Sequence, residues 1–181
     1  VDLAGDLFLL EGERTVDAIT DCLIRRGYRR IGFIGDIQYA RTNALRWLGF
    51  QEGMARNGLA AEPGLCLTKA IGRDDYRAEI AAFLDGIPKI PEAFVCASDF
   101  VAFVALNLLG ERGLRVPENV MLSGYDDTKE FLLEHHRVIT AHVQNGLLGK
   151  QIIRQLLYRI ENPVSDFEEI QIFPKILYRD N

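Results

Sequence analysis

The sequence predicts an α/β fold built on a doubly wound parallel sheet with helices on both faces. Short β-branched or aromatic runs alternate with segments of helical apolar spacing through residues 16–123. Gly27, Gly58 and Gly113 follow three of the helical segments, and glycine readily takes the left-handed conformation that ends helices. Because crossovers between parallel strands are right-handed, this alternation places helices on both faces of one sheet.

The elements of this alternating region can be assigned in order. Val16, Ile19 and Leu23 recur at helical spacing in the first helix. In the second helix the expected inward positions are Leu45, Leu48 and Met54. Strands are predicted from β-branched and aromatic runs at 31–34, 65–68, 93–97 and 120–123, and helices at 16–24, 43–57, 75–84 and 100–112.

The alternating pattern changes after Tyr125. A polar segment leads to a short predicted strand at 140–143 and a helix at 146–160, which Asn162-Pro163 ends. The segment 169–178 is expected to be a single strand. A helix that leaves the repeating unit and a late strand that returns predict that the chain crosses to a neighbouring subdomain and back.

Composition excludes several classes of partner and site. With 21 Lys and Arg against 26 Asp and Glu, the net charge is -5, which disfavours nucleic acid as a ligand of this segment. Cys22, Cys66 and Cys96 are odd in number and lack CxxC spacing, which favours a reducing compartment over disulfides or zinc. No apolar run reaches the roughly 20 residues of a membrane span, and the first residues lack the basic start of a signal peptide.

Candidate ligand residues follow the predicted strands, because open parallel sheets bind ligands at the carboxyl ends of their strands. A guanidinium together with several oxygen acceptors suits a neutral polyhydroxylated molecule, whose hydroxyls both donate and accept. The residues at these positions are Tyr39, Arg41 and Arg46 after the strand at 31–34, Ser98 and Asp99 after 93–97, and Asp126 after 120–123.

Each position also has a purely structural interpretation, which the pattern leaves open. Asp99 stands where an acid would cap a helix, and Arg46 lies in an amphipathic helix where a solvated arginine is ordinary. Asp126 and its neighbour follow Gly-Tyr and could simply form a turn. His135 and His136 are adjacent and do not share a helical face, so no metal site is predicted there.

Motifs of enzymes are absent from the sequence. There is no GxSxG elbow and no GxxxxGK phosphate loop, and GFIGD is not a dinucleotide fingerprint. We therefore expect no catalytic residues and no cofactor.

Six segments, taken in order, resemble the effector-binding core of the LacI/GalR repressors. They are LIRRGYRRIGFIGD at 23–36, RWLGFQEGM from Arg46, AFVCASDFVAFVAL from Ala93, GERGLRVPENVMLSGYDD from Gly110, ITAHVQNGLLGKQIIRQLL from Ile139, and FPKILYRDN at the end. One such match alone would be weak, but six in the same order are specific. They cover nearly all of the chain after about Leu10.

The resemblance implies a periplasmic-binding-protein-like fold of type I, with two similar subdomains and the effector in the cleft between them. We expect one full subdomain plus part of a second. Residues 1–10 would end the N-terminal subdomain or cross from it, 11–124 form the C-terminal effector-binding subdomain, 125–163 cross into the N-terminal subdomain, and 164–181 return. The family's helix-turn-helix and hinge are not in this sequence. The resemblance therefore implies a cytoplasmic homodimer that reaches operator DNA only through that absent head.

Matched position by position, the resemblance assigns effector contacts to Arg46, Ser98 and Asp126, and places Gln144 near the cleft floor. Ser98 replaces the usual asparagine. Ala70 stands where many sugar-responsive members have a tryptophan, so stacking on that residue is lost. The expected effector is a sugar, polyol or sugar phosphate other than a common hexose, and the alternative function is an exported sugar-binding protein of a transporter.

The two charged residues carry the most specific expectation. Arg46 and Asp126 should face one cleft, from the helix after the first predicted strand and from the loop after the last. We expect both at a solvent-open rim, so that replacing either by alanine leaves folding nearly intact.

Overall fold

The computed structural model describes residues 5–72, 75–131 and 133–179 and divides them between a body and an arm. The body contains a parallel sheet in the order β3-β2-β4-β5. Its strands are β2 (Ile31–Ile34), β3 (Cys66–Leu67), β4 (Ala93–Cys96) and β5 (Met121–Ser123). Its helices are α1 (Glu13–Arg25), α2 (Arg41–Arg56), α3 (Tyr76–Asp85) and α4 (Asp99–Glu111). The predicted doubly wound parallel sheet is therefore confirmed.

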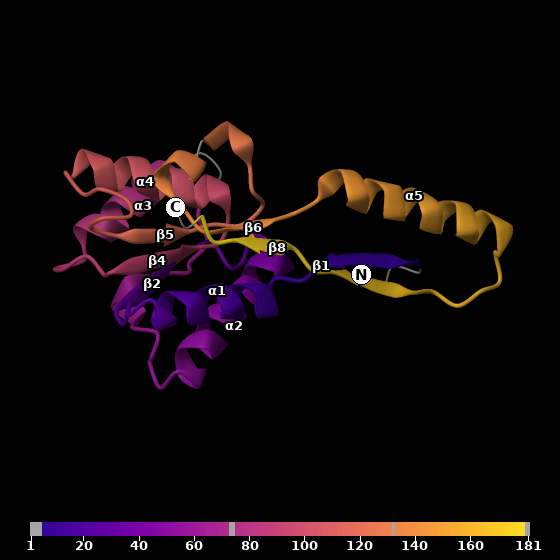
Figure 1. Ribbon diagram of the computed structural model, residues 1–181, viewed down its shortest axis with the longest axis horizontal. Helices are drawn as coiled ribbons and strands as arrows, with labels where there is room; N and C mark the ends of the chain where they lie inside the picture. Colours follow the sequence, from indigo (N-terminus) through magenta and orange to yellow (C-terminus); the bar gives the residue numbers. More distant parts are fainter. Residues whose placement is uncertain (1–4, 73–74, 132, 180–181) are drawn as a thin grey trace.

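Two clusters of buried hydrophobic side chains lie between the sheet and its helices, one on each face. Helices α1 and α2 cover one face and α3 and α4 cover the other (Figure 1). Phe33 and Val95 pack toward α1 and α2, whereas Ile34 and Phe94 pack toward α3 and α4. Both faces of these strands are buried, which explains why the strands are apolar runs without polar alternation.

The buried face of α2 differs from the expected one. Leu48, an expected inward position, is 41% exposed, and Leu45 is only half-buried. Gly49 and Gly53 instead face α1, and a Cβ built at Gly49 would lie 2.0 Å from the backbone oxygen of Glu13. The two helices pack so closely here that only glycine fits, which turns this face of α2 inward.

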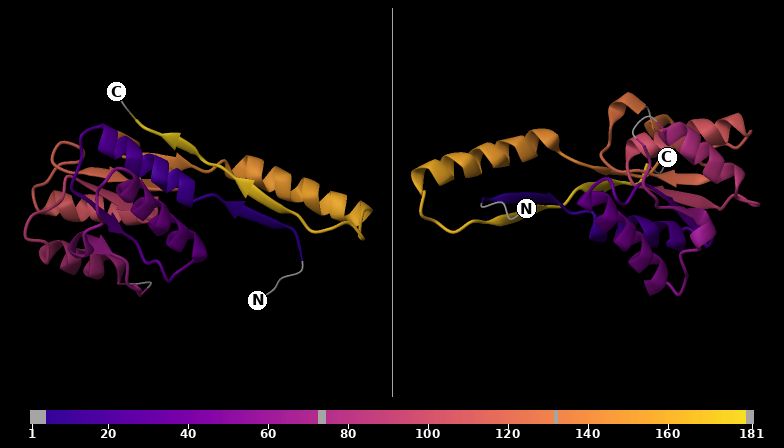
Figure 2. Two further views of the ribbon diagram at one scale, coloured as in Figure 1. Left: turned by 90° about the horizontal axis from the view of Figure 1, so that it is seen from below. Right: turned by 180° about the vertical axis from the view of Figure 1, so that it is seen from behind.

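The arm consists of β1 (Leu7–Leu10), α5 (Asn145–Glu161) and β7 (Glu169–Ile172). β1 and β7 form a parallel pair, and α5 lies alongside that pair, away from the body (Figure 2). An ion pair between Arg159 and Asp6 joins α5 to the start of β1, with the Nη2–Oδ1 atoms 2.5 Å apart. No residue of α5 is buried, and its outward apolar side chains include Ile153, Leu156, Leu157 and Ile160.

The segment 169–178 forms two strands and not the single strand that the sequence predicts. β7 ends at Ile172, and β8 (Lys175–Leu177) follows after Phe173-Pro174. β8 pairs antiparallel with β6 (Thr140–His142), while β7 pairs with β1 in the arm. Pro174 lies between β7 and β8. Because proline has no backbone N–H, it cannot donate a hydrogen bond to a neighbouring strand, and the pairing is interrupted at this residue. β6 and β8 thus connect the body to the arm.

The described residues also include short 3-10 helices at Pro63–Leu65, Lys129–Phe131 and Leu133–His136. Within the predicted crossover 125–163, residues 139–143 lie beside the end of β5, and the chain leaves the body at Gln144. Of the helices in the described part of the chain, none is long and apolar enough to span a bilayer.

Candidate functional site

A cavity of about 490 Å³ opens at the carboxyl ends of the body's strands. It lies between the first turns of α2, α3 and α4 and the loop after β5. This volume falls within the range of about 300–1,000 Å³ typical of small-molecule pockets. The lining residues are Tyr39, Thr42, Asn43, Arg46, Ile71, Tyr76, Ser98, Phe100, Val101 and Asp126.

Arg46 is the one cation among these lining residues, and it is buried, with 6% of its surface exposed. Its Nη1 donates to the carbonyl oxygen of Ala97 at 2.6 Å, and its guanidinium carbon lies 3.6 Å from the centre of the Tyr125 ring. Burial lowers the pKa of Arg46, although the nearby Asp126 carboxylate opposes this effect. The expectation of a solvent-open position for Arg46 was therefore wrong, because α2 turns this residue toward the sheet.

Asp126 brings a carboxylate to the same cavity. Its Oδ1 lies 3.6 Å from Nη2 of Arg46, and its side chain is 42% exposed. Burial raises the pKa of Asp126, and the charge of Arg46 partly reverses that rise. The structure thus brings together the two charged residues that the sequence placed in one cleft, with Asp126 at the rim and Arg46 beneath it.

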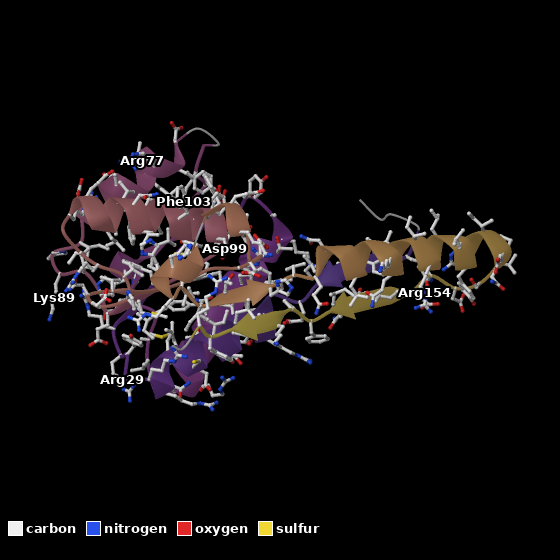
Figure 3. The ribbon with its side chains drawn as sticks, turned by 45° about the horizontal axis from the view of Figure 1, so that its top comes forward. Arg29, Arg77, Lys89, Asp99, Phe103 and Arg154 are labelled. Atoms are coloured by element: carbon white, nitrogen blue, oxygen red, sulfur yellow. The ribbon has the colours of Figure 1, made fainter. Side chains whose placement is uncertain are left out.

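Ser98 and Asp99 have different roles although they are neighbours. The Ser98 hydroxyl lines the cavity and caps α4 by accepting a hydrogen bond from the backbone N–H of Val101 at 3.3 Å. Asp99, 1% exposed, lies at the end of α4 that faces the arm (Figure 3). Its carboxylate accepts from the Thr140 hydroxyl and the Thr128 N–H, both at 2.7 Å. Asp99 is therefore absent from the cavity lining and braces the loop after β5.

Burial raises the pKa of Asp99 to about 6, with its two hydrogen bonds opposing the rise. The helix cap that the sequence allowed for Asp99 belongs to Ser98 instead.

The other predicted contacts divide between the cavity and other surfaces. Tyr39 lines the cavity with 75% of its surface exposed. Arg41 begins α2, is exposed, and does not line the cavity. Gln144 precedes α5 and lines a separate cavity of about 230 Å³ at the base of the arm.

Sequence reasoning missed the aromatic wall of the cavity. Tyr76 and Phe100 come from the first turns of α3 and α4, and their rings meet edge to face with centroids 5.4 Å apart. Phe100 directly follows Asp99, so its place at a strand end was the available signal. Nothing in the spacing of Tyr76 pointed to the cavity. These rings give the cavity an aromatic surface, which Ala70, at the position of the family's tryptophan, cannot provide.

Asn43 was noted only as a polar residue of α2, and it too lines the cavity. Its amide donates to the carbonyl oxygen of Asp36 at 2.9 Å, which fixes the side chain beside the loop after β2. Over the described ranges, no three His, Cys, Asp or Glu side chains gather closely enough to hold a metal ion.

The model of the periplasmic binding protein-like domain matches residues 20–180 of this chain. The chain belongs to this family. The matched residues include all those that line the cavity. The LacI/GalR resemblance of the sequence agrees with the relatives described next.

Repressors are among the curated relatives of this periplasmic-binding-protein-like chain. It is 32% identical over 163 residues to the HTH-type transcriptional repressor PurR of Haemophilus influenzae (strain ATCC 51907 / DSM 11121 / KW20 / Rd). It is 29% identical over 161 residues to PurR of Histophilus somni (strain 129Pt). In both cases the match covers 88% of this chain and 48% of the relative, so the chain spans about half the length of these curated relatives.

Solved structures show the same fold. The transcriptional regulator CelR in its cellobiose complex is 25% identical, with a TM-score of 0.83 over 96% of this chain and 53% of that one. A putative LacI-family regulator from Sanguibacter keddieii DSM 10542 is 23% identical, with a TM-score of 0.85 over 99% of this chain and 71% of that one. The body and the arm of this periplasmic-binding-protein-like chain therefore share the fold of these transcriptional regulators.

Proposed function

We propose that this chain is the ligand-sensing core of a LacI-type transcriptional regulator, and that its cavity binds a small polyhydroxylated effector. The observation that carries the proposal is the arrangement of Arg46 and Asp126 in one cavity wall, 3.6 Å apart. A guanidinium offers fixed paired donors and a carboxylate offers paired acceptors, so together they match vicinal hydroxyls.

Two further features of the cavity support a sugar, polyol or sugar phosphate. Nε of Arg46 is buried and has no hydrogen-bond partner among the described residues, so a donor remains for a ligand oxygen. Phe100 and Tyr76 offer aromatic surface on which the C–H face of a sugar ring packs. The proposed contacts are Arg46, Ser98, Asp126 and Tyr39, with Asn43, Tyr76 and Phe100 added from the structure.

The organisation of the whole regulator follows from this proposal. The body corresponds to the C-terminal effector-binding subdomain, and the arm corresponds to part of the N-terminal one. Effector binding would change the angle between the two subdomains and hence the spacing of two DNA-reading heads in a homodimer. Such a regulator acts in the cytoplasm, and the repressor relatives do not favour the alternative of an exported transport protein.

A ligand screen followed by a DNA-binding assay tests this function. Full-length protein would be screened by thermal shift against sugars, polyols and sugar phosphates, including cellobiose and D-ribose. We expect one compound to raise the melting temperature and to change the retardation of the gene's own promoter fragment in a gel shift. An effector that stabilises the protein but leaves DNA binding unchanged would argue against regulation.

A further inference from the structure

Three segments that are distant in the sequence meet at the Asp127 carboxylate. Oδ2 of Asp127 lies 2.7 Å from Nδ1 of His142, the last residue of β6. Oδ1 accepts from Nη2 of Arg179, just after β8, at 2.5 Å. The Asp127 side chain is only 10% exposed, so these contacts are shielded from solvent.

The two partners of Asp127 lie at the ends of the strands that connect the body to the arm, because His142 ends β6 and Arg179 closely follows β8. β6 leads within three residues into α5, and β8 follows β7 across Pro174. The loop after β5, which carries Asp126 into the cavity, is thus attached through Asp127 to both connecting strands.

The loop itself has a strained backbone. Asp126 has φ 109° and Asp127 has φ 56°, values that residues other than glycine rarely adopt. Strained backbone of this kind persists only where surrounding contacts over-determine it. Here the Asp126 N–H donates to the carbonyl oxygen of Ala141 at 2.9 Å, and the Thr128 N–H donates to Asp99 at 2.7 Å. Between these two anchors, the Asp127 N–H donates to the Thr140 hydroxyl at 3.4 Å, and the Asp127 side chain contacts His142 and Arg179.

We infer that Asp127 is a positioning residue that holds the Asp126 carboxylate opposite Arg46 and couples the cavity to the strands leading to the arm. Asp127 does not line the cavity, so it acts through its neighbour. The inference rests on the proposed function in one respect, because it takes the cavity to be the effector site. The loop geometry it describes does not depend on any ligand.

The first part of the test needs no effector. Hydrogen exchange measured by mass spectrometry would compare full-length parent protein with Asp127→Asn, and with Asp85→Asn as a matched control. Asp85 also pairs with an arginine, Arg112, but on the outer surface of α3. We expect exchange in residues 124–128 and 139–143 to rise about tenfold in Asp127→Asn and to stay within about twofold of the parent in the control. Arg179→Gln serves as a second variant if Asp127→Asn does not fold.

An unchanged exchange rate in those two stretches, or an equal rise in the sheet at 31–34 and 93–96, would overturn the positioning role. The latter result would mean that the residue only stabilises the fold.

The second part of the test measures affinity for cellobiose and D-ribose by calorimetry well below the melting temperatures of all variants. If either sugar binds the parent, Asp127→Asn should weaken its Kd about tenfold and Asp85→Asn should not. Equal Kd values for parent and Asp127→Asn would overturn the coupling while leaving the proposed function intact. If neither sugar binds the parent, these sugars are excluded as effectors, and the exchange result still decides the role of Asp127.

Discussion

Arg46 combines a structural role with the proposed binding role. Removing its side chain deletes the hydrogen bond to Ala97 and the stacking on Tyr125, both in a buried setting. A buried charged hydrogen bond and a desolvated cation–π contact together make Arg46→Ala cost about 2 to 4 kcal/mol of unfolding free energy. Asp126→Ala, at the exposed rim, should cost at most about 1 kcal/mol. Urea unfolding of both variants measures the difference, and equal losses would contradict this division of roles.

Asp99 predicts a specific pH dependence of stability. Its pKa in the folded protein is about 6, above the ordinary 3.8, because burial disfavours the charged carboxylate. The folded state therefore holds the proton more tightly, and the stabilisation from Asp99 is complete below about pH 4 and lost as the pH rises through 6. The loss amounts to about 3 kcal/mol at most.

Comparison with Asp99→Asn isolates this effect from other titrating groups. The stability advantage of the parent over the variant should shrink as the pH rises from 4 to 7 in urea unfolding. A constant difference across that interval would show that Asp99 titrates in the folded protein as it does in the unfolded chain.

Side chains of the site could be predicted where they immediately follow a strand or match a family motif. Arg46 and Asp126 were found in this way, and both line the cavity. Arg41 was not brought there, because the sequence cannot say which side of the first turn of α2 faces inward. Tyr76 was missed because it lies far from any strand end in sequence and reaches the cavity only through the packing of α3 against α4.

At the level of elements, the contact between α1 and α2 depends on Gly49. Alanine favours helices over glycine by about 1 kcal/mol, but its Cβ would overlap the backbone of Glu13 at this position. We expect Gly49→Ala to destabilise the protein by about 2 kcal/mol or more, because the backbones must move apart. Gly110→Ala in α4, with nothing within 4 Å of its Cβ, should be neutral or stabilising by up to about 1 kcal/mol. Thermal unfolding compares them, and a stabilising Gly49→Ala would refute the close packing.

The order of elements was predictable because each strand and helix of the body carries its own local pattern. The pairing of 169–178 was not, since its apolar residues fit one strand as well as two. Only the tertiary positions of β1 and β6 decide that β7 joins the arm and β8 joins the body. Leu48 was misassigned for a related reason: close approach at a glycine outweighs hydrophobic periodicity in setting the buried face of α2.

For the molecule as a whole, the net negative charge indicates that this core does not itself bind DNA. With a net charge of -5, these 181 residues lack the electrostatic attraction that supplies most non-specific DNA affinity. We expect the isolated 181-residue chain to give no shifted band with promoter DNA at moderate salt. Sequence-specific retardation by this chain would place DNA recognition in the core and contradict the proposal.

The central claim is that Arg46 and Asp126 together bind an effector from one wall of the cavity in the body. Its most direct test is a calorimetric titration of the best compound from the thermal-shift screen into full-length parent, Asp126→Ala and the control Asp85→Asn. Each lost contact to a charged group is worth about 1.5 to 3 kcal/mol, so Asp126→Ala should bind roughly ten-fold to a hundred-fold more weakly, while Asp85→Asn matches the parent. Equal affinity of Asp126→Ala and the parent for that compound would contradict the account.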